Sequence, residues 1–290
     1  MNKYFLKLMS VLLAVSILIP GIASADMQRG DMVVTLGENL TTEQKKLLLA
    51  EMDAPKDVEI VTVSNAEEHK YLDGKISSRL IGTKALSSSS ITIAAKNSGI
   101  TVKTKNINWV TEDMYKNALL TAGLKDAEIY VTAPFEVSGT AALTGLIKAY
   151  EVTTDTKISE EQKQAANEEM VETAKLGDQI GTEEATTLVE SIKEEIAVNP
   201  PQTDEELRTI ILQAAEKLGI TLTEAQIQSL IDLFNKLQDL GIDWNKVGEQ
   251  LNAAKEKVTD YLKSEEGQSF LDKLKAFFVS LIDAIKSLFS

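Results

Sequence analysis

The chain of 290 residues has no cysteine, one histidine and three arginines. Without thiols it can form no disulfide, no Cys-ligated zinc or iron–sulfur site and no cysteine nucleophile. Any Ser–His–Asp mechanism would have to use His69. That residue lies between acids and a lysine in a short predicted helix, where a side chain is usually solvated, so we predict no catalytic role for it.

Basic residues are also scarce, because 30 Lys and Arg stand against 44 Asp and Glu, a net charge of −14. This balance disfavours nucleic acid as a partner, since binding a polyanion requires Lys and Arg to displace its counterions. Residues 157–206 alone carry 14 acids and 4 bases. Such a run is usually a solvated surface, and a cation-bridged or protein-binding face is the alternative.

The first 25 residues have the pattern of a secretory signal peptide. Lys3 and Lys7 precede an apolar run, Pro20-Gly21 breaks it, and Ala23-Ser24-Ala25 forms a small-residue cleavage site. A helix of that apolar run is about 18 Å long, too short for a hydrocarbon core of about 30 Å. We expect cleavage before Asp26 and export to the cell envelope or the medium. The protein is not expected to be a lipoprotein, because the cleavage site has no cysteine.

Residues 26–152 alternate short β-type runs with helical patterns, in the order β-α-β-α-β-β-α-β-α. This order predicts an α+β fold with a mixed sheet covered by helices. Asn97-Ser98-Gly99 separates two β-type runs and predicts a hairpin, because glycine readily takes a positive φ. The predicted strands are 32–36, 58–63, 91–95, 100–105 and 127–133, and helices are predicted to start near Thr41, Ser64, Thr111 and Ser138.

Residues 157–290 predict a second, all-helical domain. Acidic helices at 158–197 are followed by a break at Pro200-Pro201 and by helices over 203–289. Gly219 and Gly241 each precede an isoleucine, as the C-terminal turn of a helix prefers. Capping-box pairs are predicted at Ser159/Gln162, Thr203/Glu206 and Thr223/Gln226.

The C-terminal helix of this domain carries a continuous apolar stripe with a 3.6-residue period. We expect the stripe either to dock onto the preceding helices, whose residues 227–237 offer an apolar face, or to bind a membrane surface or a partner groove. The stripe consists of Phe270, Leu271, Leu274, Phe277, Phe278, Leu281, Ile282, Ile285, Leu288 and Phe289.

The candidate ligand site is Ser138, Gly139 and Thr140, which follow a predicted strand and open a helix. The free backbone N–H groups of a helix start can hold an anion. The alternative is close packing, because Gly139, Ala142, Gly145 and Ala149 form a face of small residues that lets the helix approach its sheet. Close packing is the favoured interpretation, since an acid, Glu136, lies beside the site and no P-loop lysine follows it.

Carboxylate pairs are the remaining route to an enzyme, because two acids held about 5–10 Å apart can hydrolyse glycosidic bonds. Glu112, Asp113 and Glu136 lie near strand–helix turns, although the first two are better explained as acids at a helix start. The run beginning at Asp243 resembles part of a calcium loop, but Ala254 stands where a carboxylate ligand is required. We therefore predict a helix cap there and no metal site.

Two stretches carry a family resemblance. The first is Val33–Gly37 leading into Leu40–Gln44, and the second is Ser138–Glu151, with the sequence SGTAALTGLIKAYE. Both resemble the YpuA-like family of exported bacterial proteins of unknown function. The resemblance covers essentially the whole mature chain. It implies export from a Gram-positive organism, which an exported chain without cysteine also favours, and it implies no activity, cofactor or catalytic residue.

We therefore expect an exported, non-enzymatic binding protein with no cofactor. A carboxylate-dependent envelope hydrolase, or a membrane-surface adaptor acting through the C-terminal stripe, is the alternative. A protein, an envelope component and a membrane surface all stay open as partners.

Overall fold

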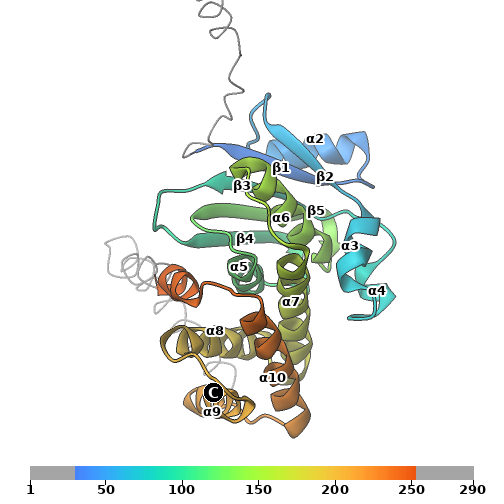
Figure 1. Cartoon of the computed structure of the whole chain (residues 1–290). Coiled ribbons are helices and arrows are strands. Elements are labelled where there is room, and N and C mark those ends of the chain that lie inside the picture. Colours follow the sequence, from blue (N-terminus) through green and yellow to red (C-terminus); the bar gives the residue numbers. More distant parts are fainter. Residues whose placement is uncertain (1–29, 253–290) are drawn as a thin grey trace, which may run out of the picture.

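The computed structural model describes residues 30–252 and has the predicted α+β fold, a mixed sheet followed by a layer of helices (Figure 1). The predicted signal peptide and the C-terminal apolar stripe lie outside these residues. The strands are β1 (Met32–Gly37), β2 (Glu59–Val63), β3 (Ser88–Ile93), β4 (Ile100–Ile107) and β5 (Ala127–Val137). The helices are α2 (Thr42–Glu51), α3 (Asn65–Leu72), α4 (Ser78–Ile81), α5 (Glu112–Thr121), α6 (Thr140–Thr154), α7 (Glu160–Ile180), α8 (Thr182–Val198), α9 (Asp204–Lys217) and α10 (Glu224–Asp239).

The five strands lie in the order β2-β1-β3-β5-β4. β1 and β2 run parallel, as do β4 and β5, and β3 is antiparallel to both of its neighbours. Parallel neighbours require a crossover connection, which α2 supplies for the first pair and α5 for the second. The sheet is therefore two β-α-β units joined through β3.

The predicted hairpin is wrong, because β5 lies between β3 and β4. The connecting loop has the expected turn, with φ of +63° at Asn97 and +72° at Gly99, but it passes over the start of β5. There the backbone N–H of Ala94 donates to the carbonyl of Asp126 at 2.7 Å, and that of Gly99 donates to its carboxylate at 3.0 Å. A turn signal specifies a reversal of the chain and does not specify which strand fills the gap.

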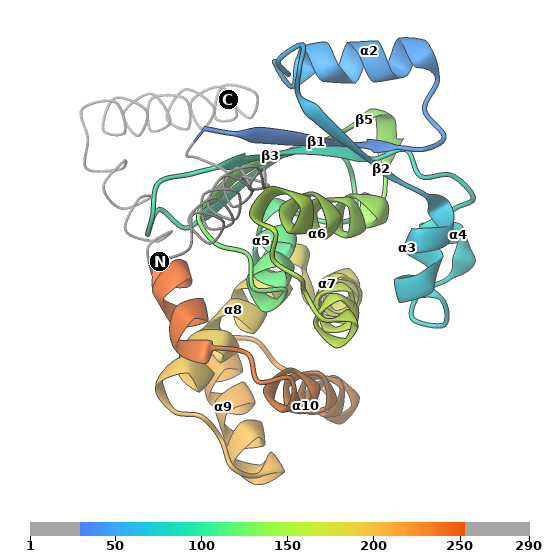
Figure 2. The same cartoon turned by 45° about the horizontal axis from the view of Figure 1, so that its top comes forward.

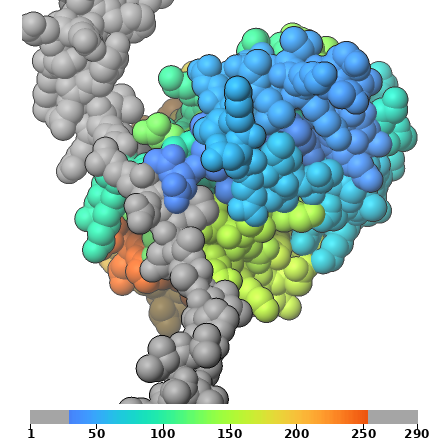
Figure 3. Space-filling view, turned by 90° about the horizontal axis from the view of Figure 1, so that it is seen from above, coloured from blue at the N-terminus to red at the C-terminus, as the bar shows by residue number. Residues whose placement is uncertain are grey.

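Helices cover both faces of the sheet, with α2 on one side and α5 and α6 on the other (Figure 2). The side chains of β1 alternate accordingly: Val34 and Leu36 pack with α2, whereas Val33 belongs to the core on the opposite face. Seen from above, the first elements, in blue, form much of the visible surface (Figure 3). Both faces of the central strands are thus buried.

Local signals at the helix starts agree with the structure, whereas α4 and the start of β3 differ from the prediction. Reciprocal capping boxes are present at Thr41 and Ser64, and α5 is capped by Thr111. The short helix α4 was not predicted. β3 starts at Ser88 instead of Ile91. The prediction missed its first residues because serine has little β-propensity. In the structure the hydroxyl of Ser88 accepts from the N–H of Gly37 at 3.2 Å, which holds this end of the strand in the sheet.

The helical layer is built around α7, which packs against α3, α5, α8 and α10 (Figure 1). One cluster of buried hydrophobic residues runs from the sheet through α7 to α10, and the apolar face of α10 packs against α7 and α9. The proposed domain boundary, between residues 152 and 157, falls at the end of α6 and in the loop before α7. The division into two domains stays a prediction. In residues 30–252 no helix is long and apolar enough to cross a membrane.

Many acids of residues 157–206 are neutralised within the fold instead of forming a uniform negative face. Glu168 on α7 binds both Lys75 and Lys236, and Glu160 binds Lys70 and Lys163. The charge run therefore combines solvated positions with ion pairs that tie the helices together.

Candidate functional site

Ser138, Gly139 and Thr140 connect the end of β5 to the start of α6, as predicted. Gly139 is the N-cap residue with φ of +94°, and it has no side chain to cap the helix. The backbone N–H groups of Thr140 and Ala141 have no hydrogen-bond acceptor among the described residues. The positive end of a helix of 15 residues is therefore left without an internal acceptor.

A cavity of about 320 Å³ lies at this helix start. Its walls come from three places: α3, the stretch from α4 to the start of β3, and the turn between β5 and α6. Two of its lining residues, Arg79 and Lys84, are cations that make no ion pair within residues 30–252. The lining is Glu68, Arg79, Leu80, Ile81, Gly82, Thr83, Lys84, Leu86, Ser87, Val137, Ser138, Gly139, Thr140 and Ala141.

Ser87 supplies an unused polar group in this wall. The residue is 3% exposed, and its hydroxyl has no hydrogen-bond partner in the part of the chain that the structure describes. A ligand in the cavity can accept a hydrogen bond from this hydroxyl.

Glu68 is the one acid in the lining of this cavity as the structure describes it, and it is only 1% exposed. Its carboxyl group contacts the hydroxyl of Thr140 and accepts from the amide of Asn65 at 3.2 Å. Burial raises the pKa of Glu68 to about 7, even though these two hydrogen bonds act to lower it. Glu68 therefore exchanges a proton close to neutral pH.

A chain of hydrogen bonds leads from Glu68 across the cavity wall to Leu80. The hydroxyls of Thr140 and Ser138 are 3.2 Å apart, and Ser138 donates to the carbonyl of Leu80 at 3.0 Å. When Glu68 is neutral, each hydroxyl can accept from one neighbour and donate to the next. When Glu68 is ionised, Thr140 must turn its proton toward the carboxylate. The protonation state of Glu68 thus sets the direction of the hydroxyl groups at the helix start.

His69 holds the wall of the cavity in place. Its Nδ1 lies 2.6 Å from the carboxylate of Asp73, and its Nε2 lies 3.1 Å from the carbonyl of Gly82. The hydrogen bond to Asp73 is the main cause that raises the pKa of His69, and the carbonyl of Gly82 adds to it. The sequence indicated a solvated ring, but the ring is half-buried and links α3 to the loop after α4.

The small-residue face of α6 packs closely against its neighbours, as the favoured interpretation held. A Cβ at Gly145 would lie 2.5 Å from a methyl group of Thr35 on β1, and the hydroxyl of Thr35 donates to the carbonyl of Gly145 at 3.0 Å. A Cβ at Gly139 would meet the hydroxyl of Tyr115 and lie 2.5 Å from Ile107. Gly139 therefore packs closely against α5 and β4 and also lines the cavity.

The other carboxylates considered from the sequence have structural partners or lie elsewhere. Glu112 accepts from the backbone N–H of Thr104 at 2.8 Å, and Asp113 pairs with Lys116 at 3.0 Å. Glu136 is exposed on β5 and does not line the cavity. Asp243 accepts from the N–H of Lys246 at 3.3 Å, which makes it the predicted helix cap. These acids do not converge on one point with Glu68.

Sequence reasoning missed Glu68 and Ser87. A signal for Glu68 was present, because it shares one helical face with Tyr71 and Leu72, both buried. A charged residue on an apolar face is an indication of a special environment. No comparable signal marks Ser87, which stands in a run of four serines.

Comparison with known proteins places the chain in a family. Residues 36–254 match the model of the family described as "Protein of unknown function (DUF1002)". The chain belongs to this family. It is also 51% identical over 274 residues, 94% of each chain, to "Uncharacterized protein YpuA" of Bacillus subtilis (strain 168). No solved structure matches it. The matched residues include the cavity, the described helices and every strand except most of β1.

Proposed function

We propose that this protein is exported and acts as a non-enzymatic binding protein, with the cavity at the start of α6 taking the anionic group of its ligand. One observation carries the proposal: Arg79 and Lys84 line the cavity at the positive end of α6, and neither has an acidic partner among residues 30–252. A helix start and nearby cations together form a favourable environment for an oxyanion. The unused hydroxyl of Ser87 offers a further donor.

The alternative of a carboxylate-dependent hydrolase has less support at this cavity. Hydrolysis of a glycosidic bond needs two carboxyl groups about 5–10 Å apart. A raised pKa suits Glu68 to the role of a general acid, but Glu68 has no second acid beside it in the described lining. Binding requires only the groups that are already present.

We expect the protein to bind sulfate, a probe that stays dianionic over the tested pH range. The double variant Arg79→Gln/Lys84→Gln should bind sulfate at least about tenfold more weakly, since it loses two charge-assisted contacts of about 1.5–3 kcal/mol each. Isothermal titration of the mature chain measures this loss. Lys45→Gln/Lys46→Gln on α2, which makes the same change of charge away from the cavity, is the control. Equal weakening in both variants would show a non-specific effect of charge and contradict the site.

Sulfate binding should also strengthen as the pH falls from 8 to 6. Glu68 carries a negative charge above its pKa of about 7 and repels an anion, whereas it is neutral below that pH. Glu68→Gln should remove this dependence and bind at pH 8 as the unchanged protein binds at pH 6. A pH profile that is the same in Glu68→Gln would assign the effect to another group, with His69 the first to examine.

Export leads to a separate expectation. Terminal sequencing or mass spectrometry of the protein from the medium or the envelope should find Asp26 as the first residue, because Ala23-Ser24-Ala25 is a small-residue cleavage site. Fractionation of the producing cells supplies the comparison. A protein that keeps Met1 and stays in the cytoplasm would contradict this part of the proposal.

A further inference from the structure

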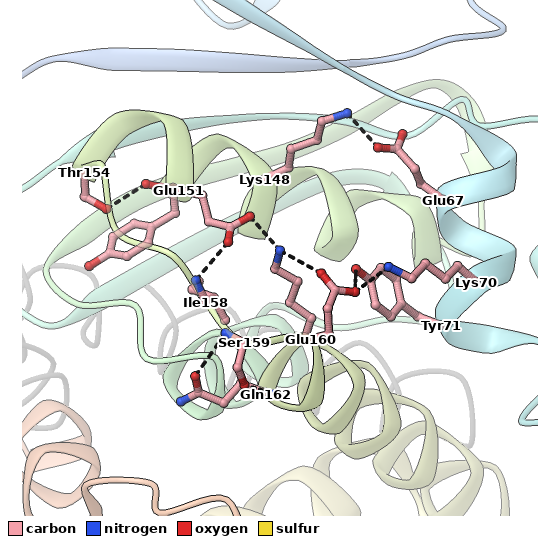
Figure 4. Close-up of polar contacts among 12 residues, drawn as sticks. Glu67, Lys70, Tyr71, Lys148, Glu151, Thr154, Ile158, Ser159, Glu160 and Gln162 are labelled. Carbon is pink, nitrogen blue, oxygen red and sulfur yellow. Dashed lines mark hydrogen bonds and ion pairs between the residues drawn. The ribbon is translucent and has the colours of Figure 1, made fainter.

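A second cavity, of about 230 Å³, lies between α3, α6 and α7 and shares no residue with the first. Each helix contributes one face to it: residues 67–71 of α3, 144–151 of α6 and 160–167 of α7. Figure 4 shows the charged side chains of these faces pointing toward one another. The lining is Glu67, Lys70, Tyr71, Thr144, Ile147, Lys148, Glu151, Glu160, Lys163 and Asn167.

The charges around this cavity are balanced, with three lysines and three glutamates in alternation. Lys148 contacts Glu67 at 2.7 Å, and Lys163 contacts Glu151 at 2.8 Å. Glu160 is shared by Lys70 and Lys163 and also accepts from the hydroxyl of Tyr71. In the part of the chain described by the structure, each of these charged groups already has a partner of opposite sign.

Two polar groups in the wall are unsatisfied within residues 30–252. The hydroxyl of Thr144 and the side-chain carbonyl of Asn167 are buried and have no hydrogen-bond partner. The orientation of the Asn167 amide is determined by its NH₂ group, which donates to the backbone carbonyl of Lys163 at 2.8 Å. A flipped amide would place two carbonyl oxygens against each other, so the free group of Asn167 is an acceptor.

We propose that this cavity binds a small zwitterion that carries an ammonium and a carboxylate group, such as a free amino acid or a short peptide. A ligand of one sign would take one member of a Lys–Glu pair and leave the other uncompensated. A zwitterion replaces both members, because its carboxylate binds the lysine and its ammonium binds the glutamate. Its N–H groups also offer a donor for Asn167, and Thr144 can donate or accept.

The exposure of two of the ion pairs makes this exchange inexpensive. The side chains of Lys70 and Glu160 are 58% and 54% exposed, and those of Lys148 and Glu67 are 40% and 38% exposed. Exposed pairs stabilise a protein by about 0–1 kcal/mol, so opening one has little effect on the fold. A cavity of this volume is smaller than the about 300–1,000 Å³ of a drug-sized pocket, which limits the ligand to about two amino acid residues.

The test is isothermal titration of the mature chain at low salt with three matched probes. L-Alanyl-L-alanine carries both charges, its N-acetyl derivative carries only the carboxylate, and its C-terminal amide carries only the ammonium. The unblocked dipeptide should bind with a Kd of about 1 mM or tighter. Each blocked form should bind at least about tenfold more weakly, because it loses one of the two charge-assisted contacts of the ligand, worth about 1.5–3 kcal/mol. Equal affinity of a blocked form, or no heat of binding at about 20 mM dipeptide, would overturn the inference.

Thr144→Val tests the site without removing an interaction of the fold. Valine keeps the shape of threonine, and the lost hydroxyl has no partner, so the melting temperature should not fall. Affinity for the dipeptide should fall at least about fivefold, corresponding to one neutral hydrogen bond. Thr153→Val lies on the same helix outside the cavity and is the control; its hydroxyl donates to Ala149. Unchanged affinity in Thr144→Val would contradict the site. Failure of sulfate to bind at the start of α6 would leave this result unaffected, since the two cavities share no residue.

Discussion

Lys193→Met is expected to lower the free energy of unfolding by about 3–5 kcal/mol, because it removes one partner of a buried ion pair. Lys193 on α8 is 0% exposed, and its ammonium lies 2.5 Å from the carboxylate of Glu169 on α7. The same ammonium donates to the carbonyl of Asn117 and the hydroxyl of Thr121, both at 2.8 Å. Methionine fills similar space but leaves the 1%-exposed Glu169 without a counter-charge.

Urea unfolding followed by circular dichroism measures this loss. The double variant Glu169→Met/Lys193→Met should recover most of the stability, because it leaves no buried charge. Lys217→Met is the control, since Lys217 is 72% exposed and 3.9 Å from Glu195, and it should change stability by less than about 0.5 kcal/mol. A loss in Lys193→Met that is no larger than in Lys217→Met would contradict the buried pair.

The loss in Lys193→Met should also depend on pH. Burial is the main cause that raises the pKa of Glu169 and lowers that of Lys193. In the variant only the hydroxyl of Thr121 still opposes the effect of burial on the pKa of Glu169. At a pH above the ordinary pKa of a carboxyl group, the unfolded chain releases the proton of Glu169, whereas the folded variant keeps it. Its deficit should therefore be largest near pH 8 and shrink toward pH 5.

Gly139→Ala is expected to destabilise the protein by about 2–5 kcal/mol, the sum of left-handed strain of about 1–2 kcal/mol and overpacking of about 1–3 kcal/mol. Gly139 has φ of +94°, and an added Cβ would collide with Tyr115 and Ile107. The side chain of Tyr115 cannot withdraw without cost, because it is fully buried and its hydroxyl donates to the carbonyl of Gly139 at 2.5 Å.

Gly123→Ala separates the two causes. Gly123 has a similar φ of +88°, and nothing lies within 4 Å of an added Cβ. This variant should lose only the strain of about 1–2 kcal/mol. Parallel urea unfolding of both variants gives the difference, which measures the close approach at the start of α6. Equal losses would show that the packing there is loose.

Much of the local structure could be predicted from the sequence, because its causes are local. Ser64 and Glu67 cap α3 reciprocally, since the groups involved are three residues apart. Gly219 ends α9 with φ of +68°, and the N–H of Ile220 donates to the carbonyl of Ala215, as in a Schellman turn. The small-residue face of α6 was also visible in the sequence, although Gly139 and Gly145 are required there by contacts with α5, β4 and β1.

The order of the strands depended on interactions that no short stretch of sequence contains. β5 enters between β3 and β4 because its pairing with β4 is part of a β-α-β unit, and that pairing competes with the local turn at Gly99. A turn signal acts over a few residues, whereas the choice of strand neighbours is settled by burial of both sheet faces.

The candidate site, too, could be predicted from the sequence only in part. Sequence alone determined the α+β class, the helix start at Ser138–Thr140, the absence of thiol chemistry and membership of a family with which its motifs agree. Tertiary packing alone brought Glu68, Ser87 and Lys84 to that helix start, from two separate parts of the chain. The physical reason is range: capping and backbone conformation are set by neighbours three or four residues away, whereas a buried carboxyl acquires its pKa from whatever the fold packs around it.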